Sequence, residues 1–194
     1  MYLAKIIVYI SILIWLLPPF RQIKGGYFLY FLILGYSDPV TLFFLWHLKL
    51  HPIYSHLIIA LVLTISIFYY TKILKIRWVV FLVLLFILSL WLCDKNTLLI
   101  PIVIFRILIV WQLFVSSANE ILLKHKINLY LSVLIFYELT SILKYIAVGI
   151  NYTNGIYMFY LTLAFEMIIC IFFIFYNLEN SPLIKLPFSN KYEY

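Results

Sequence analysis

Seven long apolar stretches, separated by short polar breaks, make up almost the whole of this 194-residue chain. Most are close to the roughly 20 apolar residues that a helix needs to cross the hydrocarbon core of a bilayer. In lipid, each backbone N–H and C=O group must find its hydrogen bond within the protein, so stretches of this length predict membrane-spanning helices. The expected spans are residues 3–20, 27–46, 53–70, 78–93, 97–117, 127–149 and 156–176.

The composition supports the same class. Hydrophobic residues make up 66% of the chain and charged residues 11%, whereas a soluble domain has about 25% charged residues. We expect an all-α, polytopic integral membrane protein: a seven-helix transmembrane bundle over residues 1–176, followed by a short cytoplasmic tail over residues 177–194. The spans leave no room for a soluble catalytic domain. The first stretch has no small-residue cleavage site and runs into Leu17-Pro18-Pro19-Phe20, so it is interpreted as a retained helix.

The distribution of Lys and Arg predicts the orientation, because cytoplasmic loops carry the excess of positive charge. The two sides of the expected bundle hold nine and four of these residues. This predicts an N-terminus outside and a C-terminus in the cytoplasm, with the cell membrane as the location. The net charge of +7 then reflects topology, and no nucleic-acid partner is expected. The nine are Arg21, Lys24, Lys72, Lys75, Arg77, Lys124, Lys126, Lys185 and Lys191; the four are Lys5, Lys49, Lys95 and Lys144.

Four ionisable residues lie near the middle of these spans: Asp38, Arg106, Glu138 and Glu166. A charge at the centre of a membrane helix costs about 2.5–3.5 kcal/mol on insertion scales, so such residues are expected to face one another or a wet cavity. Counted from the expected cytoplasmic ends, all four lie about 15–17 Å deep at a rise of about 1.5 Å per residue. They are therefore the candidate residues of a ligand or ion site.

Polar neighbours predict that these residues face the interior. Thr162 precedes Glu166 by one helical turn, and Ser141 follows Glu138 by three residues. Gly35 shares a face with Asp38 and would allow a neighbouring helix to approach closely. Pro39 removes a backbone donor beside Asp38 and predicts a kink there, with a freed carbonyl next to the carboxylate.

Arg106 and Glu138 lie on consecutive antiparallel spans and are the first choice for an ion pair. Three carboxylates and one guanidinium would leave two uncompensated negative charges in a medium of low dielectric constant, and arginine does not lose its proton. We therefore expect at least one of Asp38, Glu138 and Glu166 to be protonated at neutral pH or neutralised by a bound cation.

Three functions fit this pattern. The first is a small transporter-like or ligand-sensing protein, in which Glu138 and Glu166 bind a proton or cation, Arg106 supplies the counter-charge and Asp38-Pro39 forms a flexible polar break. The second is an accessory subunit of a larger membrane complex, whose charges pair with a partner subunit or with a second copy. The third is a membrane-embedded enzyme that modifies lipids.

No sequence pattern indicates a catalytic residue, a cofactor or a metal site. The chain contains no HExxH, GxSxG, Walker or Rossmann pattern, so an enzyme is the less favoured class. His47, His51 and His56 fall on one side of the expected membrane, but Pro52 interrupts the helical register that would bring two imidazoles to one metal ion.

One helix end is similar to that of a known family. The run Leu17-Pro18-Pro19-Phe20-Arg21-Gln22-Ile23-Lys24 slightly resembles the end of the first helix in PQ-loop proteins, the sugar-efflux and lysosomal amino-acid exporters. Those proteins have seven helices with the N-terminus outside, as expected here. The Pro-Gln pair of the family is missing from this run, and no second copy occurs near the fifth span.

Overall fold

The computed structural model describes residues 2–23, 25–73, 75–95, 97–149 and 155–185. Within them, helices of 14 residues or more dominate the structure and confirm the predicted helical class. Most of the turn predicted at residues 151–155, and residues 186–194 of the predicted tail, lie outside the described residues. The helices are α1 (Tyr2–Trp15), α2 (Pro18–Gln22), α3 (Phe28–His47), α4 (Pro52–Tyr70), α5 (Ile76–Leu92), α6 (Leu99–Lys124), α7 (Leu129–Gly149) and α8 (Gly155–Phe175); the strands are β1 (Lys126–Asn128) and β2 (Leu183–Lys185).

Among the described residues, four helices are long and apolar enough to cross a membrane: α3, α4, α6 and the Leu129–Ala147 part of α7. Two further helices, α5 and the Leu161–Phe175 part of α8, are apolar but shorter. Large apolar side chains such as Phe81 and Leu84 are exposed on the outside of the bundle, where lipid would cover them. The chain is therefore an integral, multi-pass membrane protein.

The first expected span, residues 3–20, is not one continuous helix. α1 ends at Trp15, and α2 starts at Pro18 with a proline at each of its first two positions. Proline is tolerated there because the first N–H groups of a helix have no partner within the helix. Inside a continuous helix the same two residues would remove two hydrogen bonds, so the chain breaks before them.

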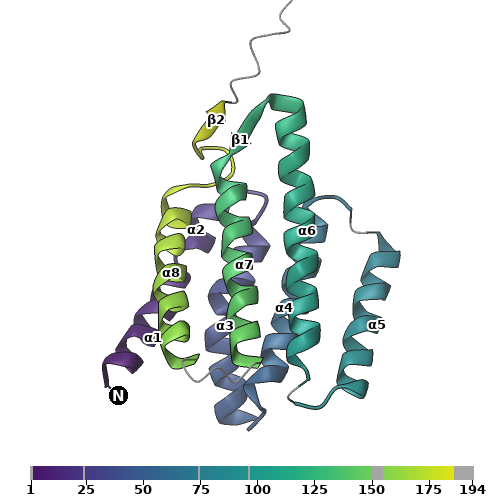
Figure 1. Cartoon of the computed structure of the whole chain (residues 1–194), viewed down its shortest axis with the longest axis vertical. Coiled ribbons are helices and arrows are strands. Elements are labelled where there is room, and N and C mark those ends of the chain that lie inside the picture. The colour runs from purple at the N-terminus through teal and green to yellow at the C-terminus, as the bar shows by residue number, and fades with distance from the viewer. Residues whose placement is uncertain (1, 24, 74, 96, 150–154, 186–194) are drawn as a thin grey trace, which may run out of the picture.

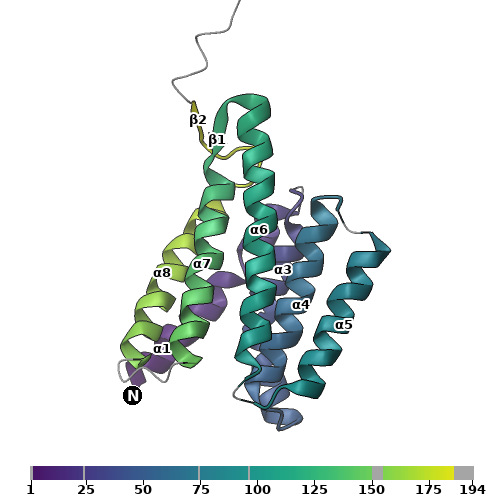
Figure 2. The ribbon, with the colours of Figure 1, turned by 45° about the vertical axis from the view of Figure 1, so that its right-hand side comes forward.

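The helices form a ring around the centre of the molecule. In order around the ring, α3 packs on α4, α4 on α6, α6 on α7 and α7 on α8, and α8 closes the ring against α1 and α2, which pack on α3. α5 lies outside the ring and packs on α4 (Figures 1 and 2). Successive long helices run in opposite directions, so the N-terminus and the strands lie at opposite ends of the molecule (Figure 1).

The end of the ring that carries the strands is filled by aromatic side chains. Phe31 of α3 contacts Phe173 of α8 with ring centroids 4.7 Å apart, and Tyr130 of α7 contacts the same ring at 5.2 Å. Tyr27, at the start of α3, lies 4.1 Å from the ring of Tyr70 in α4. All of these rings except that of Tyr70 are almost completely buried, so this end of the bundle is closed.

The helix of the fifth expected span extends beyond Ser117. α6 continues to Lys124 and ends at His125, whose φ of 52° places it in the left-handed region. The residues after Ser117 are polar, so the apolar run ends there. Polar residues do not by themselves end a helix. Glu120 and Lys124 form an ion pair one turn apart, which favours helix at this exposed end.

Part of the expected C-terminal tail is packed against the bundle. Strand β2 pairs with β1 in antiparallel fashion, with Lys185 opposite Lys126 and Leu183 opposite Asn128. The Pro182 carbonyl accepts a hydrogen bond from the backbone N–H of Leu129, at the start of α7. This small sheet was not indicated by the sequence, because two three-residue strands carry no period that could be recognised.

Gly35 allows α1 and α3 to approach closely, as predicted. A Cβ atom at this position would lie 2.6 Å from the backbone oxygen of Trp15. We expect Gly35→Ala to lower stability by about 1–3 kcal/mol, because the helices must separate to make room. Thermal unfolding in lipid bicelles, followed by tryptophan fluorescence, measures the effect.

Gly149→Ala is the matched control. A Cβ atom there would meet only the flexible end of the Leu99 side chain, at 3.3 Å. Because alanine favours helix more than glycine does, this variant should be unchanged or slightly stabilised. Equal unfolding temperatures for Gly35→Ala and the wild type would contradict the close approach.

Candidate functional site

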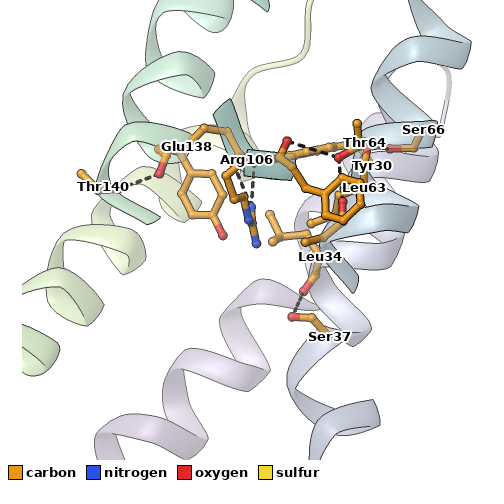
Figure 3. Close-up of polar contacts among 12 residues, drawn as sticks. Tyr30, Leu34, Ser37, Leu63, Thr64, Ser66, Arg106, Glu138 and Thr140 are labelled. Atoms are coloured by element: carbon orange, nitrogen blue, oxygen red, sulfur yellow. Dashed lines mark hydrogen bonds and ion pairs between the residues drawn. The ribbon is translucent and has the colours of Figure 1, made fainter. Parts of the chain in front are cut away.

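Arg106 and Glu138 form a buried ion pair, as predicted. One guanidinium nitrogen of Arg106, on α6, lies 2.9 Å from each carboxylate oxygen of Glu138, on α7. The Tyr30 hydroxyl, on α3, donates a hydrogen bond to the same carboxylate (Figure 3). Glu138 is completely buried and Arg106 is 5% exposed, so the pair connects three helices of the ring out of reach of solvent.

This pair does not satisfy every polar atom of Arg106. The Arg106 Nε atom is buried without a hydrogen-bond partner among the described residues. An unpaired buried donor costs about 1–3 kcal/mol. Two hydroxyl oxygens nearby, those of Ser11 on α1 and Thr41 on α3, are also buried without a partner in the described part of the chain.

A second ion pair lies further along α7. The Lys144 Nζ atom is 3.2 Å from Glu166 Oε2 and 3.4 Å from Oε1. Glu166, on α8, is 6% exposed. Lys144 was predicted among the charges at the outer end of the bundle, but its side chain reaches inward to Glu166.

The interior of the ring contains a cavity of about 420 Å³. Six helices of the ring contribute to its wall, and it extends from Arg106 to the connection between α3 and α4 at His51, which is exposed. The wall combines a few charged and hydroxyl groups with aliphatic side chains. Its polar residues are Ser11, Ser37, Asp38, Thr41, His51, His56, Arg106, Tyr137, Ser141, Lys144, Tyr145 and Glu166.

Three of the four predicted charged residues line this cavity: Asp38, Arg106 and Glu166. Glu138 is not part of the wall, and its carboxylate binds Arg106 instead. Of the supporting residues, Ser141 lines the cavity, whereas Pro39 and Thr162 do not. Three of the predicted residues thus share one cavity, and the fourth is joined to it through its ion pair with Arg106.

Asp38 differs from the two glutamates. It forms no hydrogen bond or ion pair with the side chains that the structure describes, although the Lys144 ammonium group acts on it electrostatically. Pro39 lies inside α3 without ending it, and its missing N–H leaves the carbonyl of Gly35 without its usual helical donor. Asp38 is thus the wall carboxylate without a basic partner in contact.

Four residues of these networks were not identified from the sequence. Lys144 could have been found, because it follows Ser141 by three residues and so lies on nearly the same face of the helix. Tyr30 carried no signal, since tyrosine near a span end is a common interfacial residue. His56 was considered only with His47 and His51 as a possible metal ligand. Gln22, which follows the first expected span, is completely buried.

Gln22 joins three elements at the closed end. Its Nε2 atom donates to the backbone oxygens of Phe173 and Tyr176, at 3.3 and 2.9 Å, and its Oε1 atom accepts from the Tyr130 hydroxyl at 3.0 Å. The carbonyls at the end of α8 would otherwise lack partners. This network fixes the closed end, so the cavity reaches only the opposite end of the ring.

The three histidines weighed as metal ligands do not all line the cavity. His51 and His56 line the cavity, whereas His47 stacks on Phe43 at 4.5 Å. Within the described ranges, no group of three or more His, Cys, Asp or Glu side chains could hold a metal ion.

Comparisons of the chain with protein-family models, with curated proteins and with solved structures found no match. The slight resemblance of residues 17–24 to PQ-loop proteins is therefore not extended to the rest of the chain. The fold and the site together define a multi-pass helical membrane protein whose interior holds the Arg106–Glu138 ion pair.

We expect Glu138→Leu to destabilise the protein by about 3–5 kcal/mol, because it leaves the Arg106 guanidinium buried without a counter-charge. The double variant Arg106→Met, Glu138→Leu should recover most of this loss, since it removes both charges and fills a similar volume. Denaturant unfolding in bicelles measures both effects.

Lys124→Met serves as the control, because it breaks an exposed ion pair with Glu120 that is expected to contribute less than about 1 kcal/mol. A double variant as unstable as Glu138→Leu would show that the pair is not coupled as described.

Proposed function

We propose that this protein spans the membrane seven times and binds a small ligand, cation or proton in its central cavity, as a transporter-like or ligand-sensing protein. The observation that carries the proposal is the cavity itself, whose wall holds Asp38, Arg106 and Glu166 inside a ring of apolar helices. A cavity with convergent polar groups between helices of a bundle is the usual form of a small-molecule site. Ionisable residues at this depth are expensive and typical of ion and substrate pathways.

The seven spans would be α1 with α2, α3, α4, α5, α6, α7 and α8. α5 has 17 residues and α8 has 21, so both approach the length of the hydrocarbon core. α1 and α2 together replace the single first span that was expected. Because the long helices alternate in direction, each would carry the chain across the membrane to the side opposite from where the helix began.

The orientation follows from the basic residues at the two ends. The end with the strands carries seven Lys and Arg residues in the described part of the chain, and the other end carries three: Lys5, Lys49 and Lys95. With Lys144 assigned to the interior, the asymmetry is stronger than the sequence suggested. We therefore place the strands in the cytoplasm of the cell and the open end of the cavity outside. The seven are Arg21, Lys72, Lys75, Arg77, Lys124, Lys126 and Lys185.

The charges of the interior support a different division of roles from the one expected. Glu138 is paired with Arg106 and Glu166 with Lys144, which leaves Asp38 without a basic partner in contact. The excess negative charge is then one and not two. We therefore propose Asp38 as the group that takes up a proton or contacts a cation, with the two ion pairs forming the polar wall beside it.

The accessory-subunit hypothesis would be favoured by charged faces that look outward from the bundle. Arg106, Glu138 and Glu166 are all buried, so these three charges are not available to a partner chain. The self-contained binding protein is preferred for this reason.

The orientation has a direct test. In a Cys93→Ser, Cys170→Ser background, Lys49→Cys should react with a membrane-impermeant maleimide added to intact cells, because Lys49 lies at the end proposed to be outside. Lys126→Cys should react only after the cells are opened. The reverse pattern would place the cavity opening in the cytoplasm.

The site is tested by measuring charge displacement in reconstituted vesicles on a solid-supported membrane, after concentration jumps of H⁺, Na⁺, K⁺ and a panel of small amines and amino acids. At least one jump should give a protein-dependent signal that Asp38→Asn removes, because the carboxylate can then neither bind a proton nor attract a cation. This readout detects binding as well as transport.

Asp94→Asn is the matched control, since Asp94 is exposed in the connection between α5 and α6. It should keep the full signal. Folded Asp38→Asn protein with an unchanged signal, or no signal from any jump, would contradict the proposal.

A further inference from the structure

We infer that the cavity takes a small organic monocation, an ammonium group on an apolar body, with the ammonium placed at Asp38. This inference rests on the proposed function, namely that the cavity is a ligand site, and it specifies the chemical class of the ligand. It depends on the charge of the wall, on the size of the cavity and on the side chains around Asp38.

The charge of the wall is complementary to one positive charge. Arg106 is neutralised by Glu138 at 2.9 Å, and Lys144 is neutralised by Glu166 at 3.2 Å. Asp38 has no such partner among the described residues. A ligand with a single positive charge would bring the interior to neutrality, and pairing is the usual condition for keeping a charge inside a bilayer.

The volume of the cavity favours an organic ligand over a bare metal ion. Hard cations such as Ca²⁺ need six or more oxygen ligands at about 2.3–2.6 Å, which requires a tight cage. This cavity has a volume of about 420 Å³. That lies within the range of roughly 300–1,000 Å³ typical of small-molecule sites.

The wall around Asp38 provides contacts for both parts of such a ligand. Three hydroxyl-bearing residues share the cavity wall with Asp38: Ser37 and Thr41 on α3, and Ser11 on α1. Hydroxyl oxygens accept N–H hydrogen bonds. Tyr137 and Tyr145 offer aromatic rings, which attract cations. The aliphatic part of the wall would surround the apolar body; it consists of Ile12, Leu34, Leu42, Ile53, Ile59, Leu99 and Leu163.

An anionic ligand is the main alternative to be separated by experiment. Arg106 keeps one unpartnered nitrogen, Nε, which could in principle meet a carboxylate. However, the guanidinium charge is already balanced by Glu138, and Lys144 is held by Glu166. An anion would therefore add a second uncompensated negative charge beside Asp38, so the wall favours a cation.

The test compares three probes of similar size and different charge: phenethylammonium, 2-phenylethanol and 3-phenylpropionate. Binding to the full-length protein in nanodiscs is measured by isothermal titration calorimetry. We expect phenethylammonium to bind most tightly, and Asp38→Asn to weaken it about tenfold or more, since a buried charge loses its partner. Asp94→Asn should leave the affinity unchanged.

Two outcomes overturn the inference while leaving the cavity a ligand site. One is equal binding of the ammonium and the alcohol, or an ammonium affinity that Asp38→Asn does not change. The other is tighter binding of the propionate, which would assign the site to anions. Folding of Asp38→Asn is checked by its thermal unfolding, and Asp38→Glu, which keeps the charge, should retain measurable phenethylammonium binding.

The remaining outcomes separate this inference from the proposed function. If no probe binds at millimolar concentration but a jump of H⁺ or Na⁺ still gives an Asp38-dependent charge displacement, the organic cation is wrong and the ion site stands. If neither probe binding nor charge displacement is found, both proposals fail together.

Discussion

The Arg106 guanidinium and the Glu138 carboxylate are both buried, and the arrangement of α6 and α7 follows from the cost of leaving either charge alone. A single contact of 2.9 Å to each carboxylate oxygen fixes how the two helices face one another. The Tyr30 hydroxyl donates a hydrogen bond to the same carboxylate and so connects α3 to the pair. Three helices of the ring are thus connected by one ion pair, in a medium where apolar packing alone gives little specificity between helices.

The two ends of the ring differ in how their polar groups are satisfied. At the end with the strands, the Gln22 side chain donates hydrogen bonds to the carbonyl groups at the end of α8. Buried aromatic rings fill the space between the helices there. Toward the other end, the ring encloses a cavity in which Asp38, Thr41 and Ser11 have no described hydrogen-bond partner. The packed aromatic end and the cavity thus place the open space of the interior toward one end of the ring.

Much of the interior was predictable, because a charged side chain inside a membrane must face other polar groups or a wet cavity. The pairing of Arg106 with Glu138 followed from their depth and from the short connection between their helices. The close approach at Gly35 followed from the absence of a side chain. Lys144 was misassigned because a lysine five residues from a helix end can reach either the interface or the interior, and its partner Glu166 lies on another helix. The extension of α6 past Ser117 depended on local backbone chemistry that an apolar pattern does not report.

The sequence by itself determined the class: apolar stretches of membrane length permit only helices, and charges within them must face inward. It also limited the candidate residues to a few positions at one depth. Only the tertiary structure decided which carboxylate lacks a base, because that depends on how helices distant in the chain are rotated against one another. The same rotation placed α5 outside the ring and left a cavity at its centre. The helical period determines on which face of its helix a residue lies. Which other helix contacts that face depends on how all the helices pack together.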